Sequence, residues 1–95
     1  MAKSVANVPT QSASRYLQQL CKHWGHKYPV EFDARHGVIS LPMGPVTMDA
    51  AQDELGVELD AEDPAGLDRF EGVVAEHLSR FAFREELKFD WRREA

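Results

Sequence analysis

Residues 63–91, with the sequence DPAGLDRFEGVVAEHLSRFAFREELKFDW, decide which fold the rest of the chain must complete. The pair Asp63-Pro64 is typical of a helix start, because the Asp side chain can accept from free amides and the first turn does not need the N–H that Pro lacks. Apolar residues then recur at spacings of three and four as far as about Ala82. This pattern predicts an amphipathic helix whose apolar stripe consists of Leu67, Phe70, Val73, Val74, Leu78 and Phe81.

The end of the same stretch has a period of two. After a joint at residues 83–86, the side chains of Leu87, Phe89 and Trp91 alternate with charged ones. Alternation of this kind predicts a strand with one buried face. The helix and the strand must therefore pack against elements that come from the rest of the chain.

The N-terminal part of the chain is expected to begin with a mobile or extended segment. Residues 1–9 are small and polar and end in Pro, which predicts a flexible lead-in. A first helix is expected from Thr10 to Gly25, with its apolar stripe formed by Ala13, Leu17, Leu20 and Trp24.

Between the two helices, four short runs alternate apolar and polar side chains, at residues 30–33, 38–41, 46–50 and 55–60. Short connections favour antiparallel strands, and one-sided alternation predicts a sheet with one solvated face. The expected fold is a single α+β domain over residues 10–93: a two-layer sandwich in the order α-β-β-β-β-α-β, with a mostly antiparallel sheet and both helices on one face. The sequence does not determine which strand pairs with the last one. A single hydrophobic core is expected to contain Leu17, Val57, Phe70 and Phe89.

Composition and charge exclude several classes of function. The chain has 95 residues, 43% of them hydrophobic, and a net charge of -5, which argues against a nucleic-acid partner because phosphate binding depends on Lys and Arg. No apolar run approaches the roughly 18 residues of a membrane span. The only cysteine is Cys21, so no intramolecular disulfide can form, and a cytoplasmic location is expected.

Two runs carry a resemblance to a known family. They are SRYLQQLCKHWGHK at residues 14–27 and EHLSRFAFREELKFDW at residues 76–91. Together they resemble the bacterial domain of unknown function family 2218, and the resemblance extends from about Ala13 to Arg93.

The resemblance implies a stand-alone bacterial domain that occurs with siderophore-interacting flavoproteins, which release iron by reduction. It therefore implies an accessory role in siderophore or iron handling. The chain has no Gly-rich turn between a strand and a helix that would bind a flavin or nicotinamide, so reductase chemistry would belong to a partner reductase.

Basic and histidine side chains gather where the first helix should end. Such groups can receive a carboxylate, phosphate or catecholate, so an anionic small molecule is an expected partner. The alternative is a solvated helix end whose cations favour the helix dipole. The candidate ligand-binding residues are Lys22, His23, His26, Lys27, His77 and Arg84.

Thiol and imidazole groups suit zinc, copper or iron, so a metal ion is the one cofactor considered. Cys21 and His23 lie about 200° apart around a helix and cannot chelate one ion while both stay helical. The alternative interpretation makes Cys21 a buried apolar residue and His77 a core histidine bonded to a carbonyl or carboxylate. No metal site is assigned, and the candidate ligands are Cys21, His23, His26 and His77.

Three functions remain open. The first is a non-catalytic binding or accessory domain, because the chain has no nucleophile motif and no catalytic residue can be assigned. The second is a small metal- or cofactor-dependent enzyme that uses His23, His26 and His77. The third is a homodimeric interaction module that pairs through an exposed sheet edge.

Overall fold

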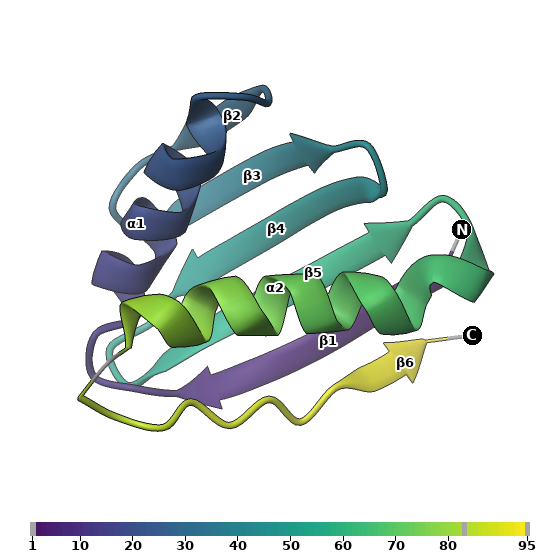
Figure 1. The fold of residues 1–95 in the computed structure, drawn as a ribbon. Coiled ribbons are helices and arrows are strands. Elements are labelled where there is room, and N and C mark those ends of the chain that lie inside the picture. Colours follow the sequence, from purple (N-terminus) through teal and green to yellow (C-terminus); the bar gives the residue numbers. More distant parts are fainter. Residues whose placement is uncertain (1, 83, 95) are drawn as a thin grey trace.

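The computed structural model describes residues 2–82 and 84–94, which form an α+β sandwich (Figure 1). Both helices lie on one face of an antiparallel sheet, as the alternating patterns predicted. The strand order is β2-β3-β4-β5-β1-β6. The elements are β1 (Ala2–Pro9), α1 (Ala13–Gly25), β2 (Val30–Phe32), β3 (His36–Leu41), β4 (Gly44–Ala50), β5 (Glu54–Ala61), the 3-10 helix η1 (Pro64–Gly66), α2 (Leu67–Phe81) and β6 (Arg92–Glu94).

The N-terminal residues form a strand, where the sequence predicted a flexible lead-in. β1 pairs with β5 along its whole length, from Ala2 opposite Ala61 to Pro9 opposite Glu54. Its buried side chains are Ser4, Ala6 and Val8. They alternate as a strand requires, but two of them are too small or too polar to give a clear hydrophobic pattern. The expectation for this segment was therefore wrong.

The C-terminal strand begins later than the sequence predicted. β6 pairs with the outer side of β1, which settles the neighbour that the sequence left open. In the segment 84–91, Leu87 is buried, and Phe89 and Trp91 are half-buried with their rings stacked at 5.7 Å between centroids. The predicted buried face therefore exists, but the backbone ladder does not reach it. Phe83, part of the predicted joint, lies outside the described residues.

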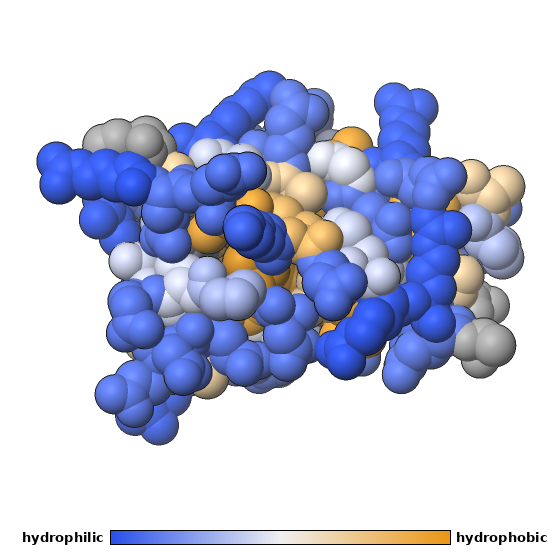
Figure 2. Space-filling model, turned by 90° about the horizontal axis from the view of Figure 1, so that it is seen from below, coloured by the Kyte–Doolittle hydropathy of each residue, from blue (hydrophilic) through white to orange (hydrophobic). Residues whose placement is uncertain are grey.

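One core fills the space between the helices and the sheet. Leu17, Val57 and Phe70 are fully buried in it and Phe89 packs against its border, as expected. α1 covers β2, β3 and β4, whereas α2 crosses β1 and β5 (Figure 1). In the part of the chain that the structure describes, neither helix is long and apolar enough to cross a membrane. Seen from the side of the C-terminal segment, the surface is mostly hydrophilic around a small apolar area (Figure 2).

A polar network joins β1, α2 and β6. The buried Ser4 hydroxyl donates to the Glu71 carboxylate at 2.5 Å, and the Arg93 guanidinium donates to the same carboxylate at 3.0 and 3.2 Å and also to Asp68. Burial alone would raise the pKa of Glu71, but the hydrogen bonds from Arg93 and Ser4 outweigh it and hold this pKa below its ordinary value. The network therefore ties the last strand to the helix layer.

Candidate functional site

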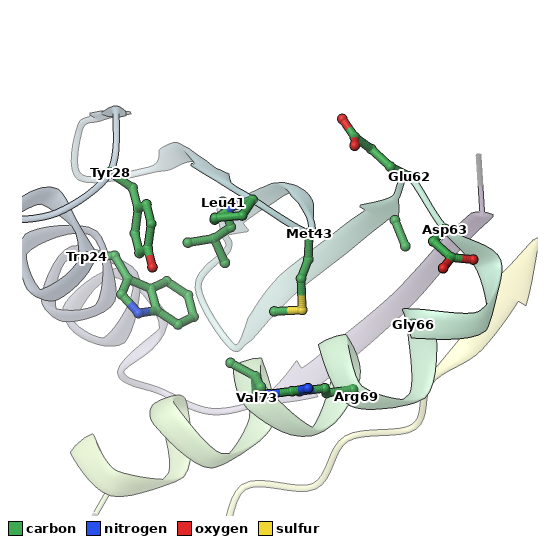
Figure 3. Close-up of a pocket in the computed structure, with 11 residues that line it drawn as sticks. Trp24, Tyr28, Leu41, Met43, Glu62, Asp63, Gly66, Arg69 and Val73 are labelled. Atoms are coloured by element: carbon green, nitrogen blue, oxygen red, sulfur yellow. The ribbon is translucent and has the colours of Figure 1, made fainter.

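A cavity of about 570 Å³ opens between the last turn of α1, the β3–β4 turn, the end of β5 and the first turns of α2 (Figure 3). Residues far apart in the sequence meet in it because the end of α1, the β3–β4 turn and the start of α2 lie at the same corner of the sandwich. We call it the corner cavity. It is lined by Trp24, Tyr28, Leu41, Pro42, Met43, Ala61, Glu62, Asp63, Gly66, Arg69 and Val73.

Two aromatic residues form the wall at the end of α1. Trp24 lies in the last turn of the helix, only 7% exposed, and packs in the core while its ring also lines the cavity. The chain then folds back, and the Tyr28 amide donates to the Trp24 carbonyl at 2.8 Å. The Tyr28 ring stands beside the indole (Figure 3). The two rings form a broad apolar wall with polar atoms at its rim.

The opposite wall is the β3–β4 turn, and its shape depends on a glycine. Gly44 has a φ of 136°, a conformation that favours glycine, and a Cβ at this position would collide with the carbonyl oxygen of Asp60. The Glu62 amide also donates to the Met43 carbonyl at 3.1 Å. The turn is therefore held against the end of β5, with the Met43 side chain directed into the cavity (Figure 3).

The charged lining residues differ in what they can offer a ligand. Asp63 accepts from the Ala65 amide at 3.0 Å, where it caps η1, and the Glu62 side chain points away from the cavity (Figure 3). Arg69 is exposed and runs along α2 towards Val73. Among residues 2–82 and 84–94, no carboxylate forms an ion pair with it. The cavity thus combines apolar walls with a cation that can bind an anion.

Four of the predicted ligand-binding residues lie at the end of α1, the helix whose Trp24 lines this cavity. Lys22, His23, His26 and Lys27 are exposed at or just beyond the last turn of α1. The Lys27 ammonium lies 5.9 Å from the centroid of the Tyr28 ring, so it borders the aromatic wall. These basic side chains are thus exposed together at the end of α1, and the cavity that Trp24 and Tyr28 line there was not expected.

Arg84 is not part of this group. It lines a second cavity, of about 270 Å³, at the opposite end of α1, together with Arg15 and Tyr16. There the Glu85 carboxylate accepts from the Tyr16 hydroxyl at 2.5 Å and from the Thr10 hydroxyl at 3.0 Å. Burial, with Glu85 as the second cause, raises the pKa of Tyr16. Arg84, which was included on the condition that the fold brought it near, therefore does not join the basic end of α1, because the chain after α2 returns to the start of that helix.

His77 meets His23 across the two helices. The ring centroids are 5.5 Å apart, and the His77 ring also lies 4.8 Å from that of Trp24. The half-buried His77 donates from Nδ1 to the Val73 carbonyl at 2.7 Å, because a carbonyl oxygen can only accept. His77 therefore has the backbone partner that the core-histidine interpretation requires.

Of the four metal candidates, only His23 and His77 meet. Cys21 is fully buried against Gly37 of β3, and burial raises the pKa of its thiol to about 11. His26 follows the last residue of α1 and is exposed. The described residues contain no group of three or more His, Cys, Asp and Glu side chains that could hold a metal ion. Cys21 thus matches the buried apolar residue of the alternative interpretation.

Sequence reasoning missed Arg69 and Met43. Arg69 belongs to the polar side of a helix, where most charged residues are simply solvated, and Met43 lies in a Pro- and Gly-rich turn. Only the convergence of the turn with both helices gives these residues a shared role. No local signal in the sequence could have identified them.

Comparisons with known proteins place the whole domain in a family. A model of the family described as "Uncharacterized protein conserved in bacteria (DUF2218)" matches residues 5–92. The chain is also similar to PA4090 from Pseudomonas aeruginosa, whose structure was determined by NMR. The two are 38% identical over 97% of this chain and 96% of that one, with a TM-score of 0.80. No curated protein matches the chain.

Proposed function

Because the chain belongs to the DUF2218 family of uncharacterised bacterial proteins, we propose its function from its own site. The protein is a binding domain that holds a small anion with an aromatic or apolar body in the corner cavity. The observation that carries this proposal is the position of Arg69, a cation without an ion pair among the described residues, at the side of an apolar hollow.

The size and the lining of the cavity support a small-molecule ligand. Ligand sites are typically clefts of about 300–1,000 Å³ that are mostly apolar and contain a few polar groups that fix the orientation. The corner cavity has a volume of about 570 Å³. Its indole, phenol and thioether walls, from Trp24, Tyr28 and Met43, suit a flat ring better than a chain of hydrophilic groups.

Arg69 supports a negative charge on that ligand. A guanidinium presents a planar fork of donors that matches a carboxylate or a phosphate, and apolar surroundings strengthen such a pair. Lys27 adds a second cation at the rim beside Tyr28. The two cations Arg69 and Lys27 thus stand at an apolar hollow whose carboxylates, Glu62 and Asp63, face away from it or cap η1. In a chain with a net charge of -5, so few cations favour a small anion over an extended polyanion.

The lining favours binding over catalysis. Nucleophilic or acid–base chemistry needs a nucleophile within reach of a base, or two titratable groups with distinct roles. The carboxylates of the lining, Glu62 and Asp63, face away from the cavity or cap η1. We therefore propose that any chemistry on the ligand belongs to a partner. A catecholate, the iron-binding group of some siderophores, is one member of this ligand class. Binding of a catecholate would therefore test the proposed link with siderophore or iron handling and with a partner reductase.

The test is a titration of the protein with three matched probes, followed by NMR. The probes are benzoate, 2,3-dihydroxybenzoate and the neutral benzyl alcohol. Shifts of the Trp24 and Met43 signals should saturate with the two anions, and benzyl alcohol should bind more weakly. Arg69→Gln should weaken benzoate binding about tenfold or more, because a hydrogen bond to a charged group is lost. Tighter binding of 2,3-dihydroxybenzoate than of benzoate would support a catecholate as the ligand.

The control variant is Arg80→Gln. Arg80 is also exposed on α2, but it pairs with Glu76 and lies outside the corner cavity. It should leave benzoate binding unchanged. Equal binding of benzoate to wild type and Arg69→Gln, or shifts spread over the surface without saturation, would overturn the proposal.

A further inference from the structure

We propose that His23 and His77 form a two-histidine site for a divalent transition metal, with Cu²⁺ as the preferred ion. The site lies between α1 and α2 next to Trp24, and neither histidine lines the corner cavity. It is distinct from the proposed anion site and does not depend on it. Water or a small ligand completes the coordination.

The separation of the two rings suits a shared ion. A histidine nitrogen binds zinc or copper at about 2.0–2.1 Å, so the ring centroid lies roughly 3.2 Å from the metal. Two such rings at a tetrahedral angle place their centroids roughly 5 Å apart. The rings of His23 and His77 are 5.5 Å apart and inclined at 47°. A small adjustment of the exposed His23 side chain therefore brings both rings to one ion.

The hydrogen bond of His77 prepares this ring as a ligand. Because Nδ1 donates to the Val73 carbonyl, the neutral ring has its lone pair on Nε2. Metal-binding histidines typically donate their other N–H to a carbonyl or carboxylate, which fixes the tautomer and the ring orientation. The contact that satisfies His77 in the free protein is thus the contact that a metal site requires.

The surroundings leave the site accessible and keep its two histidines close together. His23 is exposed and His77 half-buried, so solvent can fill the open positions. The rings sit on two helices whose buried faces share one core, through Leu20 and Trp24 of α1 and Val74 and Leu78 of α2. Imidazole ligands suit copper, nickel and zinc, and Cu²⁺ binds most tightly in this series.

Trp24 provides the readout. Its ring lies 4.8 Å from His77 and 6.4 Å from His23, and Cu²⁺ bound between them should quench its fluorescence. The other tryptophan, Trp91, stacks on Phe89 in the C-terminal segment. The experiment therefore uses the Trp91→Phe protein, in which Trp24 is the only indole.

Addition of CuCl₂ should quench this fluorescence to saturation at one ion per chain. His77→Gln and His23→Gln should each raise the half-saturating concentration about tenfold or more. Electron paramagnetic resonance should detect two coordinated imidazole nitrogens, and one in either variant. If His77→Gln fails to fold, His23→Gln decides, because an exposed ring has little part in the core.

His26→Gln is the matched control, because His26 is exposed just beyond the same helix without a ring contact to the pair. It should leave the titration unchanged. The proposal is overturned if the quench survives in both His23→Gln and His77→Gln, or if His26→Gln removes it. Loss of benzoate binding in Arg69→Gln with an intact copper titration would separate the two sites.

Discussion

Two arginines, Arg69 of α2 and Arg93 of β6, have opposite surroundings. Arg93 of β6 donates to Glu71 and Asp68, and Glu71 also accepts from the buried Ser4. Arg69, two residues before Glu71 on the helix, runs along the corner cavity without an ion pair among the described residues. One side of the helix therefore uses its charges to hold the sheet together, while the other leaves a charge open to a ligand.

The difference between these two arginines shows how a structural charge can be told from one that is available to a ligand. A buried carboxylate is stable only when donors satisfy it, so Glu71 has its partners within the chain. An exposed guanidinium remains hydrated and costs the fold little when it has no partner. Charge alone does not distinguish the two residues in the sequence. Their partners in the structure do.

The largest expected effect on stability comes from a substitution in the turn that forms one wall of the corner cavity. Gly44→Ala forces a Cβ into the Asp60 carbonyl at a positive φ, so it should lower the free energy of unfolding by about 3 kcal/mol. Gly72→Ala is the control, because a Cβ there meets nothing within 4 Å in the middle of α2, and it should stabilise the protein by about 0.5–1 kcal/mol. Urea unfolding measures both. Equal stability of the two variants would refute the role of Gly44.

The next largest effect on stability is expected from the polar network of Ser4, Glu71 and Arg93. Glu71→Ala leaves the buried Ser4 hydroxyl without its acceptor and should cost about 2 kcal/mol at pH 7. Because the folded pKa of Glu71 is lowered, its contribution is complete above the ordinary Glu pKa of about 4.3 and is lost as the pH falls through the folded value. The difference between wild type and variant should therefore shrink in acid.

Unfolding curves at pH 7 and at pH 3 would test this, with Glu76→Ala as the control. Glu76 is on the same helix but pairs with Arg80 at the surface, so its removal should cost about 0.5 kcal/mol or less. A difference for Glu71→Ala that stays constant with pH would contradict the network.

The smallest effect is expected at an exposed pair on the solvated face of the sheet. The hydrogen bond with Asp49 raises the pKa of His36, so the pair stabilises the fold below the ordinary His pKa and loses this effect as the pH rises through the raised value. Asp49→Asn should lower the His36 pKa in an NMR titration and hardly change stability. An unchanged pKa would show that the pair does not form in solution.

The sequence predicted much of the fold because most of its strands and both helices have strong apolar periodicity. β1 was missed because two of its buried side chains, Ser4 and Ala6, give little hydrophobic signal. The C-terminal segment was misplaced for a different reason. Alternation at Leu87, Phe89 and Trp91 reports which side is buried, and it does not report whether the backbone pairs with a neighbour.

The candidate site was only half predictable. The basic end of α1 follows from the sequence, because Lys22, His23, His26 and Lys27 are adjacent in it. The cavity depends on Arg69 meeting that end across the helix layer. The His23 and His77 pair likewise depends on how two helices cross, which local periodicity does not determine.

The burial of Cys21 has a consequence for how the molecule can be observed. Its thiol is fully enclosed against Gly37, and its raised pKa leaves almost no thiolate at neutral pH. A thiol reagent can therefore react only when α1 lifts away from β3. The sequence contains one cysteine, so the rate at which Cys21 is modified reports how often α1 separates from the sheet. The thiol is thus a built-in probe of local opening in the native protein.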